Sequence, residues 1–280
     1  MGREISIPLK IVFRGGDADQ GRLDLYDGAD AIFGFAKALQ IATHAFVKYS
    51  ITKSAPSIKG AKIYLQPPSA GSFIEPLQAV ITDPSFMAGV TTGVITNAFY
   101  DFIKLSLGRA AGLLFDPETA TIRKRIEKDE PFFDELADIL EGPLREAHRT
   151  IEETGGTVSL ERPRSKLLTF DTETLDWVKT REEDEASSYR LGTVTRFNIL
   201  SHNGRMFDKT EGRTIPFKRG EYLNDASVLL LSKSLDDANN KLPGLLEFQV
   251  TPVRSARGTI KRFILSSCRK PGTLGPAHSM

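Results

Sequence analysis

Hydrophobic and polar positions alternate at the start of the chain. Apolar residues occupy every second position over residues 5–11, which is the period of a strand with one buried face. The Gly15-Gly16 pair predicts the end of that strand. Over residues 26–49 the apolar positions instead recur every three or four residues, so this stretch is expected to form a helix buried on most of its surface.

Two further strands are expected around a proline-rich turn. Residues 62–65 and 72–77 have strand character and flank the sequence Pro-Pro-Ser-Ala-Gly at 67–71. Pro76 has no backbone N–H to give to a neighbouring strand. The second strand is therefore predicted to lie at a sheet edge or to end at this proline.

Apolar residues dominate a long segment at 84–112. Residues 84–100, 17 in all, contain no charged side chain, and after Asp101 and Lys104 the apolar character continues to Phe115. The pattern predicts a buried helix over 84–115. A helix that spans a bilayer needs about 20 apolar residues, so the uncharged stretch alone is short for that role.

Glycines in this segment recur four residues apart. This spacing lets a second helix approach closely, and threonine and asparagine side chains can hydrogen-bond across the contact. The segment is expected to be a buried helix of a soluble core, an oligomer interface or a helix that enters a membrane. Asp101, Lys104 and Arg109 favour the first two, because a charge near the bilayer centre costs about 3 kcal/mol. The residues of this expected contact are Gly89, Gly93, Gly108, Gly112, Thr92, Thr96 and Asn97.

The chain changes character twice beyond residue 115. An acidic helical region is expected up to about residue 155, followed by short strands over 157–178. The charged run at 181–188 has no apolar periodicity and predicts a linker. Beyond it, turn signals such as Asn203-Gly204 separate short strands. The strand candidates lie at 191–200, 205–209, 213–218, 227–232, 245–250 and 259–265.

These patterns predict an α+β protein with two domains. An N-terminal domain of strands and helices spans residues 1–180 and contains the apolar helix at 84–115. A small β-barrel or sandwich spans 189–269, and residues 270–280 are expected to form a flexible tail. The chain has 280 residues, of which 40% are hydrophobic and 26% charged, so it is long enough to bury a sizeable core.

Charge divides the chain more sharply than its net value of +1 suggests. Residues 116–188 carry 11 basic and 20 acidic side chains, whereas residues 189–280 carry 15 and 7. In the basic region the charges are interleaved with Phe197, Phe207, Phe217 and Phe263, as in barrels that hold single-stranded nucleic acid. The alternative is a barrel whose phenylalanines form the core while its arginines point outward. The candidate nucleic-acid contacts are Arg196, Arg205, Lys218, Arg219, Arg257, Lys261 and Arg262.

Residue types that carry catalytic chemistry are scattered along the chain. The four histidines lie far apart, and Cys268 has no second cysteine for a disulfide or a thiolate site. The sequence has no GxGxxG or GxxxxGK[ST] phosphate loop and no GxSxG nucleophile elbow. We therefore expect no metal, no cofactor and no catalytic residue, with a hydrolase of dispersed site as the alternative. The single cysteine and the absence of a signal-peptide pattern favour a cytoplasmic location.

The N-terminal half has a recurring layout of short motifs. It begins with Phe13-Arg14-Gly15-Gly16-Asp17-Ala18-Asp19 and Arg22-Leu23-Asp24, and continues with the helix to Tyr49, Gly71-Ser72-Phe73 and the apolar small-residue helix. Over about residues 5–112 this layout resembles a largely uncharacterised bacterial family. It is also loosely similar to the membrane effector of Hailong-type anti-phage defence. That resemblance implies an oligomeric toxic effector at the inner membrane, held inactive by an oligonucleotide that a partner nucleotidyltransferase makes.

Two functional hypotheses follow. In the first, the protein is a non-catalytic effector of bacterial anti-phage defence that forms homo-oligomers through the 84–112 helix and acts at a membrane. In the second, it is a soluble module that binds single-stranded nucleic acid or a nucleotide on its basic barrel, in the manner of an oligonucleotide-binding fold. Salt-dependent binding is expected for the second.

Overall fold

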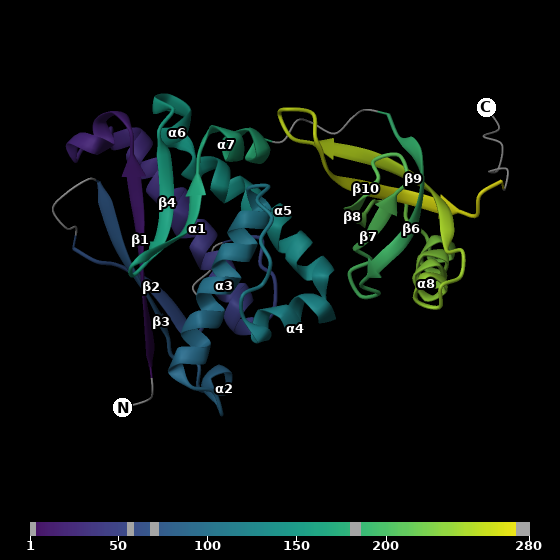
Figure 1. The fold of residues 1–280 in the computed structure, drawn as a ribbon, viewed down its shortest axis with the longest axis horizontal. Coiled ribbons are helices and arrows are strands. Elements are labelled where there is room, and N and C mark those ends of the chain that lie inside the picture. The colour runs from purple at the N-terminus through teal and green to yellow at the C-terminus, as the bar shows by residue number, and fades with distance from the viewer. Residues whose placement is uncertain (1–3, 55–58, 68–72, 180–185, 273–280) are drawn as a thin grey trace. The chain divides into compact units, whose positions relative to one another are not determined.

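The computed structural model describes residues 4–54, 59–67, 73–179 and 186–272. The chain forms two compact units, one made of residues 1–128 and 132–179 and the other of residues 129–131 and 180–280. Figure 1 labels the helices and strands of both units. Each unit has a hydrophobic core of its own. The predicted α+β fold class with a C-terminal β-barrel is confirmed. Most of the predicted turn at 67–71, most of the predicted linker and most of the predicted tail lie outside the described residues.

The N-terminal unit combines a five-stranded sheet with helices. Its strands pair antiparallel in the order β2-β3-β1-β4-β5. Only the first two residues of α5 group with the other unit. The elements are β1 (Ile5–Arg14), η1 (Gly16–Gln20), α1 (Leu25–Lys48), β2 (Ala61–Leu65), β3 (Ile74–Ile81), α2 (Pro84–Met87), α3 (Thr92–Ala110), α4 (Ala120–Lys128), α5 (Glu130–Ala147), α6 (Arg149–Thr154), β4 (Thr157–Arg162), β5 (Ser165–Phe170) and α7 (Thr172–Val178).

The first strand and the first long helix confirm the predictions from periodicity. In β1 the apolar residues at alternate positions are buried and join one core with α1 and α3. Phe46 of α1 lies at the centre of this core, with its ring centroid 5.4 Å from those of Phe99 and Phe102 of α3. Asp24 caps the start of α1 by accepting hydrogen bonds from the backbone N–H groups of Tyr26 and Asp27.

Pro76 does not lie on an edge strand, which corrects the prediction. It belongs to β3, which pairs with β2 on one side and β1 on the other. The ladder between β2 and β3 ends at the pair Leu65 and Leu77, so Pro76 lies just beyond the end of the ladder. The carbonyl of Pro76 accepts from the N–H of Gln66 on that side, so its missing N–H also faces the end of the ladder. A proline is tolerated here because its missing N–H lies beyond the last residue pair of the β2–β3 ladder.

The apolar segment is not one helix over 84–115. It is divided into α2 and α3 by residues 88–91, where Gly89 has a φ of +70°. A positive φ cannot continue an α-helix, and glycine adopts it at little cost. The predicted burial holds for most of α3, whose residues from Ala98 to its C-terminal end are largely in the core.

Two stretches that were expected to be strands are helices. Residues 172–178 form α7, because Asp171 and Thr174 make a capping box that starts a helix there. In the C-terminal unit residues 227–232 lie within a helix that Asn224 caps by accepting from the N–H of Ser227. Its short apolar run suits a buried strand or a helix equally, and the cap decides for the helix.

The C-terminal unit is a closed barrel of five strands. Around the barrel the order is β6-β7-β8-β10-β9, with β8 and β10 parallel and the other neighbours antiparallel. This connectivity, with a helix between the third and fourth strands, is that of an oligonucleotide- and oligosaccharide-binding (OB) fold. The elements are β6 (Ser188–Phe197), β7 (Gly204–Asp208), β8 (Arg213–Arg219), α8 (Asp225–Asn239), β9 (Leu245–Arg254) and β10 (Ile260–Arg269).

Candidate functional site

At the C-terminal end of α3, side chains of the same unit occupy the space beside two glycines. A Cβ atom on Gly108 would lie 2.7 Å from the ring of Phe115, and one on Gly112 would lie 2.3 Å from the ring of Trp177. Real Cβ atoms do not come this close to a neighbour. The second glycine pair therefore serves packing inside the N-terminal unit.

The first glycine pair does not share a helical face. Gly89 precedes α3 and Gly93 is its second residue, and a Cβ on either glycine would meet no atom within 4 Å. Thr92 and Asn97 are exposed beside them and Thr96 is half-buried. These residues form an exposed, uncharged surface at the start of α3.

The three charges that follow are bound within the unit. The Asp101 carboxylate accepts from the backbone N–H groups of Glu118 and Thr119 at 3.1 and 2.7 Å. Lys104 pairs with Glu118, and Arg109 pairs with Asp134 at 2.9 Å. Within the described part of the chain, no helix combines the length and the apolar character that a bilayer-spanning segment needs.

The phenylalanines of the barrel are divided between core and surface. Phe217 and Phe263 are buried, and Phe197 packs half-buried against the same core, as expected if these residues form the interior. Phe207 is the exception, because 42% of its surface is exposed. The barrel therefore presents an aromatic ring on its outside.

The outer face of β7 carries a basic and an aromatic residue in sequence. Phe207 is exposed and Arg205 lies on the same side with its side chain 17% exposed, while Met206 between them lies in the core. Across the ladder Arg205 lies opposite Arg196 of β6, and Phe207 lies opposite Thr214 of β8. Small neighbours leave the aromatic ring accessible, and two predicted basic residues lie next to it on the same face.

The other predicted basic contacts differ in exposure. Arg219 is exposed at the end of β8, Arg257 is exposed in the turn between β9 and β10, and Lys218 is half-buried. Arg262 is half-buried as well. Lys261 is only 6% exposed, so it does not contribute to an exposed basic surface as the sequence suggested.

Glu130 neutralises part of this basic face. It belongs to the segment of residues 129–131 that groups with the barrel. Its carboxylate forms an ion pair with Arg205 and lies 3.7 Å from Arg196. A phosphate group that approached these two arginines would compete with this carboxylate.

Some exposed residues of the barrel were not singled out from the sequence. Ile199 and Leu200, in the loop between β6 and β7, are 63% and 92% exposed. Tyr189 of β6 is 54% exposed, and the guanidinium of Arg269 lies 4.8 Å from its ring centroid. The loop between the first two strands is one of the regions through which OB folds contact ligands. The topology of the fold, and not the sequence, draws attention to the two loop residues Ile199 and Leu200.

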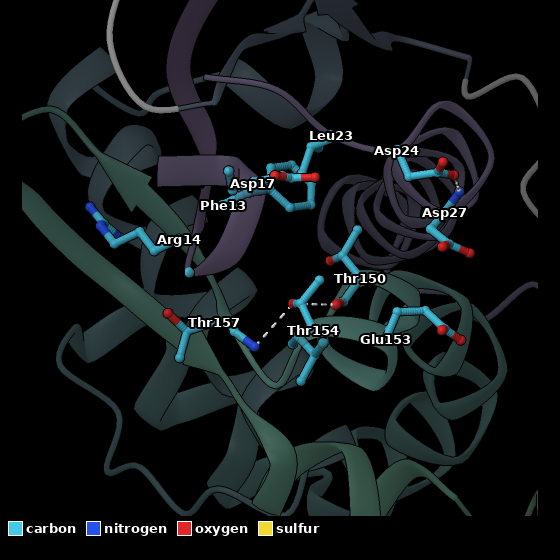
Figure 2. Close-up of a pocket in the computed structure, with 14 residues that line it drawn as sticks. Phe13, Arg14, Asp17, Leu23, Asp24, Asp27, Thr150, Glu153, Thr154 and Thr157 are labelled. Atoms are coloured by element: carbon cyan, nitrogen blue, oxygen red, sulfur yellow. Dashed lines mark hydrogen bonds between the residues drawn. The ribbon is translucent and has the colours of Figure 1, made fainter. Parts of the chain in front are cut away.

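A small pocket lies at the end of β1 in the N-terminal unit (Figure 2). It is enclosed by η1, the start of α1, α6 and the start of β4, and its volume is about 70 Å³. Two glycines bring these elements together: a Cβ on Gly15 would lie 2.9 Å from Gly156, and one on Gly156 would lie 2.4 Å from the carbonyl oxygen of Arg14. The motif at 13–24 that was singled out in the sequence supplies one wall of this pocket.

A family comparison covers the N-terminal unit. Residues 9–179 match the family model of a domain of unknown function, DUF7946. The chain belongs to this family. No curated protein and no solved structure matches the chain. The DUF7946 match includes both walls of the pocket and ends before β6, so the barrel lies outside the matched region.

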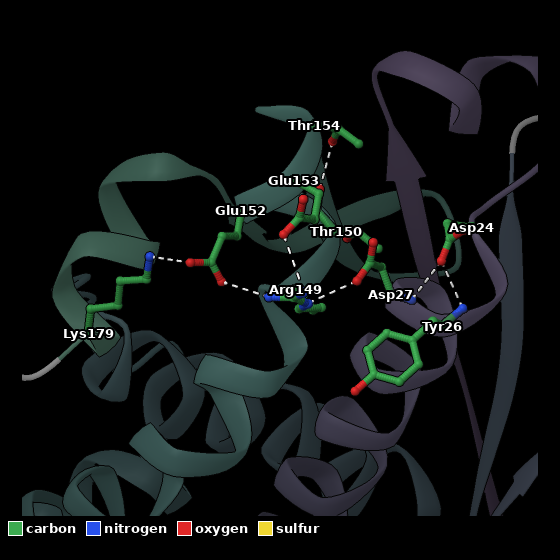
Figure 3. A network of polar contacts seen from close by, with 9 residues as sticks. All are labelled: Asp24, Tyr26, Asp27, Arg149, Thr150, Glu152, Glu153, Thr154 and Lys179. Atoms are coloured by element: carbon green, nitrogen blue, oxygen red, sulfur yellow. Dashed lines mark hydrogen bonds and ion pairs between the residues drawn. The ribbon is translucent and has the colours of Figure 1, made fainter.

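An ion-pair network lies beside the pocket of the DUF7946 domain (Figure 3). Arg149 at the start of α6 is its centre, with Nε 2.9 Å from Asp27 of α1. The same guanidinium lies 3.6 Å from Glu152 and 3.4 Å from Glu153, and Lys179 pairs with Glu152. The network ties α1 to α6, two of the elements that enclose the pocket. Among the described residues, no three His, Cys, Asp or Glu side chains come together to hold a metal ion.

Proposed function

We propose that the C-terminal barrel binds a single-stranded oligonucleotide across the outer face of β6, β7 and β8. The observation that supports this most directly is the exposed ring of Phe207 with Arg205 and Arg196 beside it. The barrel has the connectivity of an OB fold, in which the face of the second and third strands contacts ligands. Fold alone does not imply function, so the proposal depends on these side chains.

Stacking and phosphate contacts would act together at this face. An aromatic side chain stacked on a base contributes about 1 to 3 kcal/mol, independent of base identity. Residues 189–280 carry eight more basic than acidic side chains, an excess that attracts phosphates. The proposal therefore predicts binding with little sequence preference and a strong dependence on salt.

Replacing the exposed ring tests the proposal. Phe207→Ala in the full chain should weaken binding of a fluorescent oligothymidine by roughly 5- to 100-fold in an anisotropy titration at low salt, because one stacking contact is lost. The matched control is Tyr26→Ala, which removes a 75% exposed aromatic ring from α1 of the other unit and should leave affinity unchanged. Equal affinity of Phe207→Ala and wild type, or no binding by wild type at low salt, would contradict the proposal.

An oligonucleotide-binding barrel is compatible with an effector that a bound oligonucleotide controls. The other part of that hypothesis, self-association through the 84–112 segment, has less support. The space beside Gly108 and Gly112 is occupied by Phe115 and Trp177 of the same unit. Only the exposed start of α3 is left for a contact between copies. We therefore propose oligonucleotide binding as the function and do not extend it to assembly.

A further inference from the structure

The pocket at the end of β1 contains a buried hydroxyl group without a partner. Thr150 of α6 is 7% exposed, and its Oγ1 atom has no hydrogen-bond partner among the described residues. In Figure 2 the Thr150 side chain points into the pocket. Buried hydroxyl groups are nearly always hydrogen-bonded, because burial removes the hydrogen bonds that they would make to water. A ligand or a water molecule in the pocket would supply the missing partner.

The neighbouring threonine does not share this property. The Thr154 hydroxyl donates to the carbonyl oxygen of Thr150 at 2.7 Å and accepts from the N–H of Gly156 at 3.1 Å. Its bonds close the turn between α6 and β4. Thr150 Oγ1 is thus distinguished from an adjacent hydroxyl that has a structural role.

The charge around the pocket favours a cation. Four acidic residues line it: Asp17 pairs with Arg22 at 3.0 Å, Asp27 and Glu153 pair with Arg149, and Asp24 caps α1. Arg14 also lines the pocket, but its guanidinium is held by Ser159 at 2.7 Å and by Glu161 at 3.0 Å. An anion would meet a local excess of negative charge, whereas a cation would be attracted.

The arrangement suits a nitrogen cation better than a metal ion. The carboxylates here do not converge as a set of metal ligands. Asp24 Oδ1 is occupied by two backbone N–H groups of α1, and Asp27 Oδ1 by Arg149. A primary ammonium needs fewer oxygen partners than a metal ion does. It donates three hydrogen bonds, which hydroxyl and carboxylate oxygens can both accept. A volume of about 70 Å³ accommodates a group of this size.

We propose that this pocket binds a primary ammonium group, with Thr150 Oγ1 as one acceptor and the surrounding carboxylates as the counter-charge. The group could be delivered by a free small amine, by a lysine side chain or by a peptide N-terminus. All three present the same three N–H donors. The apolar wall formed by Phe13, Leu23 and Ile151 would contact the carbon atom attached to the nitrogen.

Methylammonium is the simplest probe of this site. We would titrate methylammonium chloride into the isotopically labelled full chain and follow the backbone amide signals of Gly15, Thr150 and Gly156 at constant ionic strength. A ligand of two heavy atoms binds with a dissociation constant on the order of 10 mM at best. Saturable shifts in that range, absent with tetramethylammonium chloride, are expected because tetramethylammonium has no N–H donor. Identical shifts with both salts, or saturable shifts with inorganic phosphate instead, would overturn the proposal.

Variants at Thr150 test the hydroxyl itself. Thr150→Val keeps the shape and removes the acceptor, so it should weaken methylammonium binding at least fivefold, whereas Thr150→Ser should retain it. Thr43→Val is a matched control, because the Thr43 hydroxyl is also buried without a partner among the described residues but lies outside this pocket. Unchanged binding in Thr150→Val, or equal loss in Thr43→Val, would refute the role of Thr150.

Two further probes distinguish the source of the ammonium group. Nα-acetyl-lysine amide presents it on a long side chain, and alanine amide presents it beside a peptide bond. Tighter binding of either probe than of methylammonium assigns a peptide source. If both probes fail to bind while methylammonium binds, the source is a free small amine.

Discussion

Both units of the protein expose aromatic side chains, but the charges near these rings have opposite signs. On α1 of the DUF7946 domain, Tyr26 is 75% exposed and shares a shallow hollow with Asp24 and Asp30. On the barrel, Phe207 is 42% exposed and lies two residues from Arg205. A ring among carboxylates favours cations, whereas a ring among arginines favours phosphates. A net charge of +1 hides these opposite preferences.

The two units also differ in what internal packing leaves for a partner. In the DUF7946 domain Phe115 and Trp177 pack against the glycines at the end of α3, so this part of the helix contacts its own unit and not a second copy. In the barrel Phe207 is left outside although Phe217 and Phe263 fill the core. The binding surfaces that we propose are therefore the acidic pocket in one unit and the basic face in the other.

The largest expected effect is on the packing of α3. Gly112→Ala should lower the free energy of unfolding of the DUF7946 domain by about 3 kcal/mol, because its Cβ would collide with Trp177 and because Gly112 has a φ of +78°. Chemical denaturation with circular dichroism measures the loss. Gly93→Ala, at the other end of α3, is the matched control: a Cβ there meets nothing within 4 Å, and the change should alter stability by less than about 1 kcal/mol.

Two results at these glycines would contradict the comparison between the two units. A stable Gly112→Ala monomer would mean that Trp177 does not occupy this space. A dimer or larger assembly of the wild type that Gly93→Leu dissolves would restore the exposed start of α3 as an interface. Size-exclusion chromatography with light scattering distinguishes these outcomes.

Local sequence patterns predict the elements of this fold better than its contacts. The alternation in β1 and the three-to-four residue period of α1 are properties of the chain itself, so both elements were found. The partner of Gly112 was not, because Trp177 is 65 residues away in sequence. The prediction of a strand at 227–232 is wrong because a short apolar run fits a strand and a helix equally, and the helix cap at Asn224 is the signal that separates them.

The candidate sites show the same limit. The basic and aromatic composition of the barrel was visible in the sequence, but which phenylalanine is exposed depends on the register of β7, where Met206 faces the core. The motif at 13–24 was recognised as a layout without a site. Its pocket needs Thr150 and Gly156, which only the fold brings next to it.

Acidification should act on the DUF7946 domain through His148. This imidazole is fully buried, with Nδ1 2.6 Å from the carbonyl oxygen of Leu144 and Nε2 2.9 Å from the hydroxyl of Thr174. Burial lowers the pKa of His148 below its usual value of about 6.5. The unfolded chain therefore binds a proton more readily, and stability that is present above about pH 6.5 is lost as the pH falls below it.

Tryptophan fluorescence measures this effect in one unit alone. The only tryptophan, Trp177, lies in the DUF7946 domain. The denaturant midpoint for unfolding of this domain should decrease when the pH is lowered from 7.5 to 5.5, and the decrease should be smaller in His148→Asn. His44→Asn is the control, because burial also lowers the pKa of His44 but leaves that ring less enclosed. An equal pH dependence of wild type and His148→Asn would assign the effect to other groups.

The smallest expected effect concerns the carboxylate on the basic face of the barrel. Glu130→Gln removes a carboxylate that pairs with Arg205 and neighbours Arg196, so the negative charge that would repel a phosphate at this face is lost. An ion pair at a protein surface is worth up to about 1 kcal/mol, which corresponds to an increase of about two- to fivefold in affinity for the oligothymidine. Asp237→Asn is the matched control: it removes the same charge from the same unit but pairs with Lys233 on α8. If both variants increased affinity equally, net charge alone would control binding. A gain confined to Glu130→Gln would place the phosphate at Arg196 and Arg205, beside the ring of Phe207.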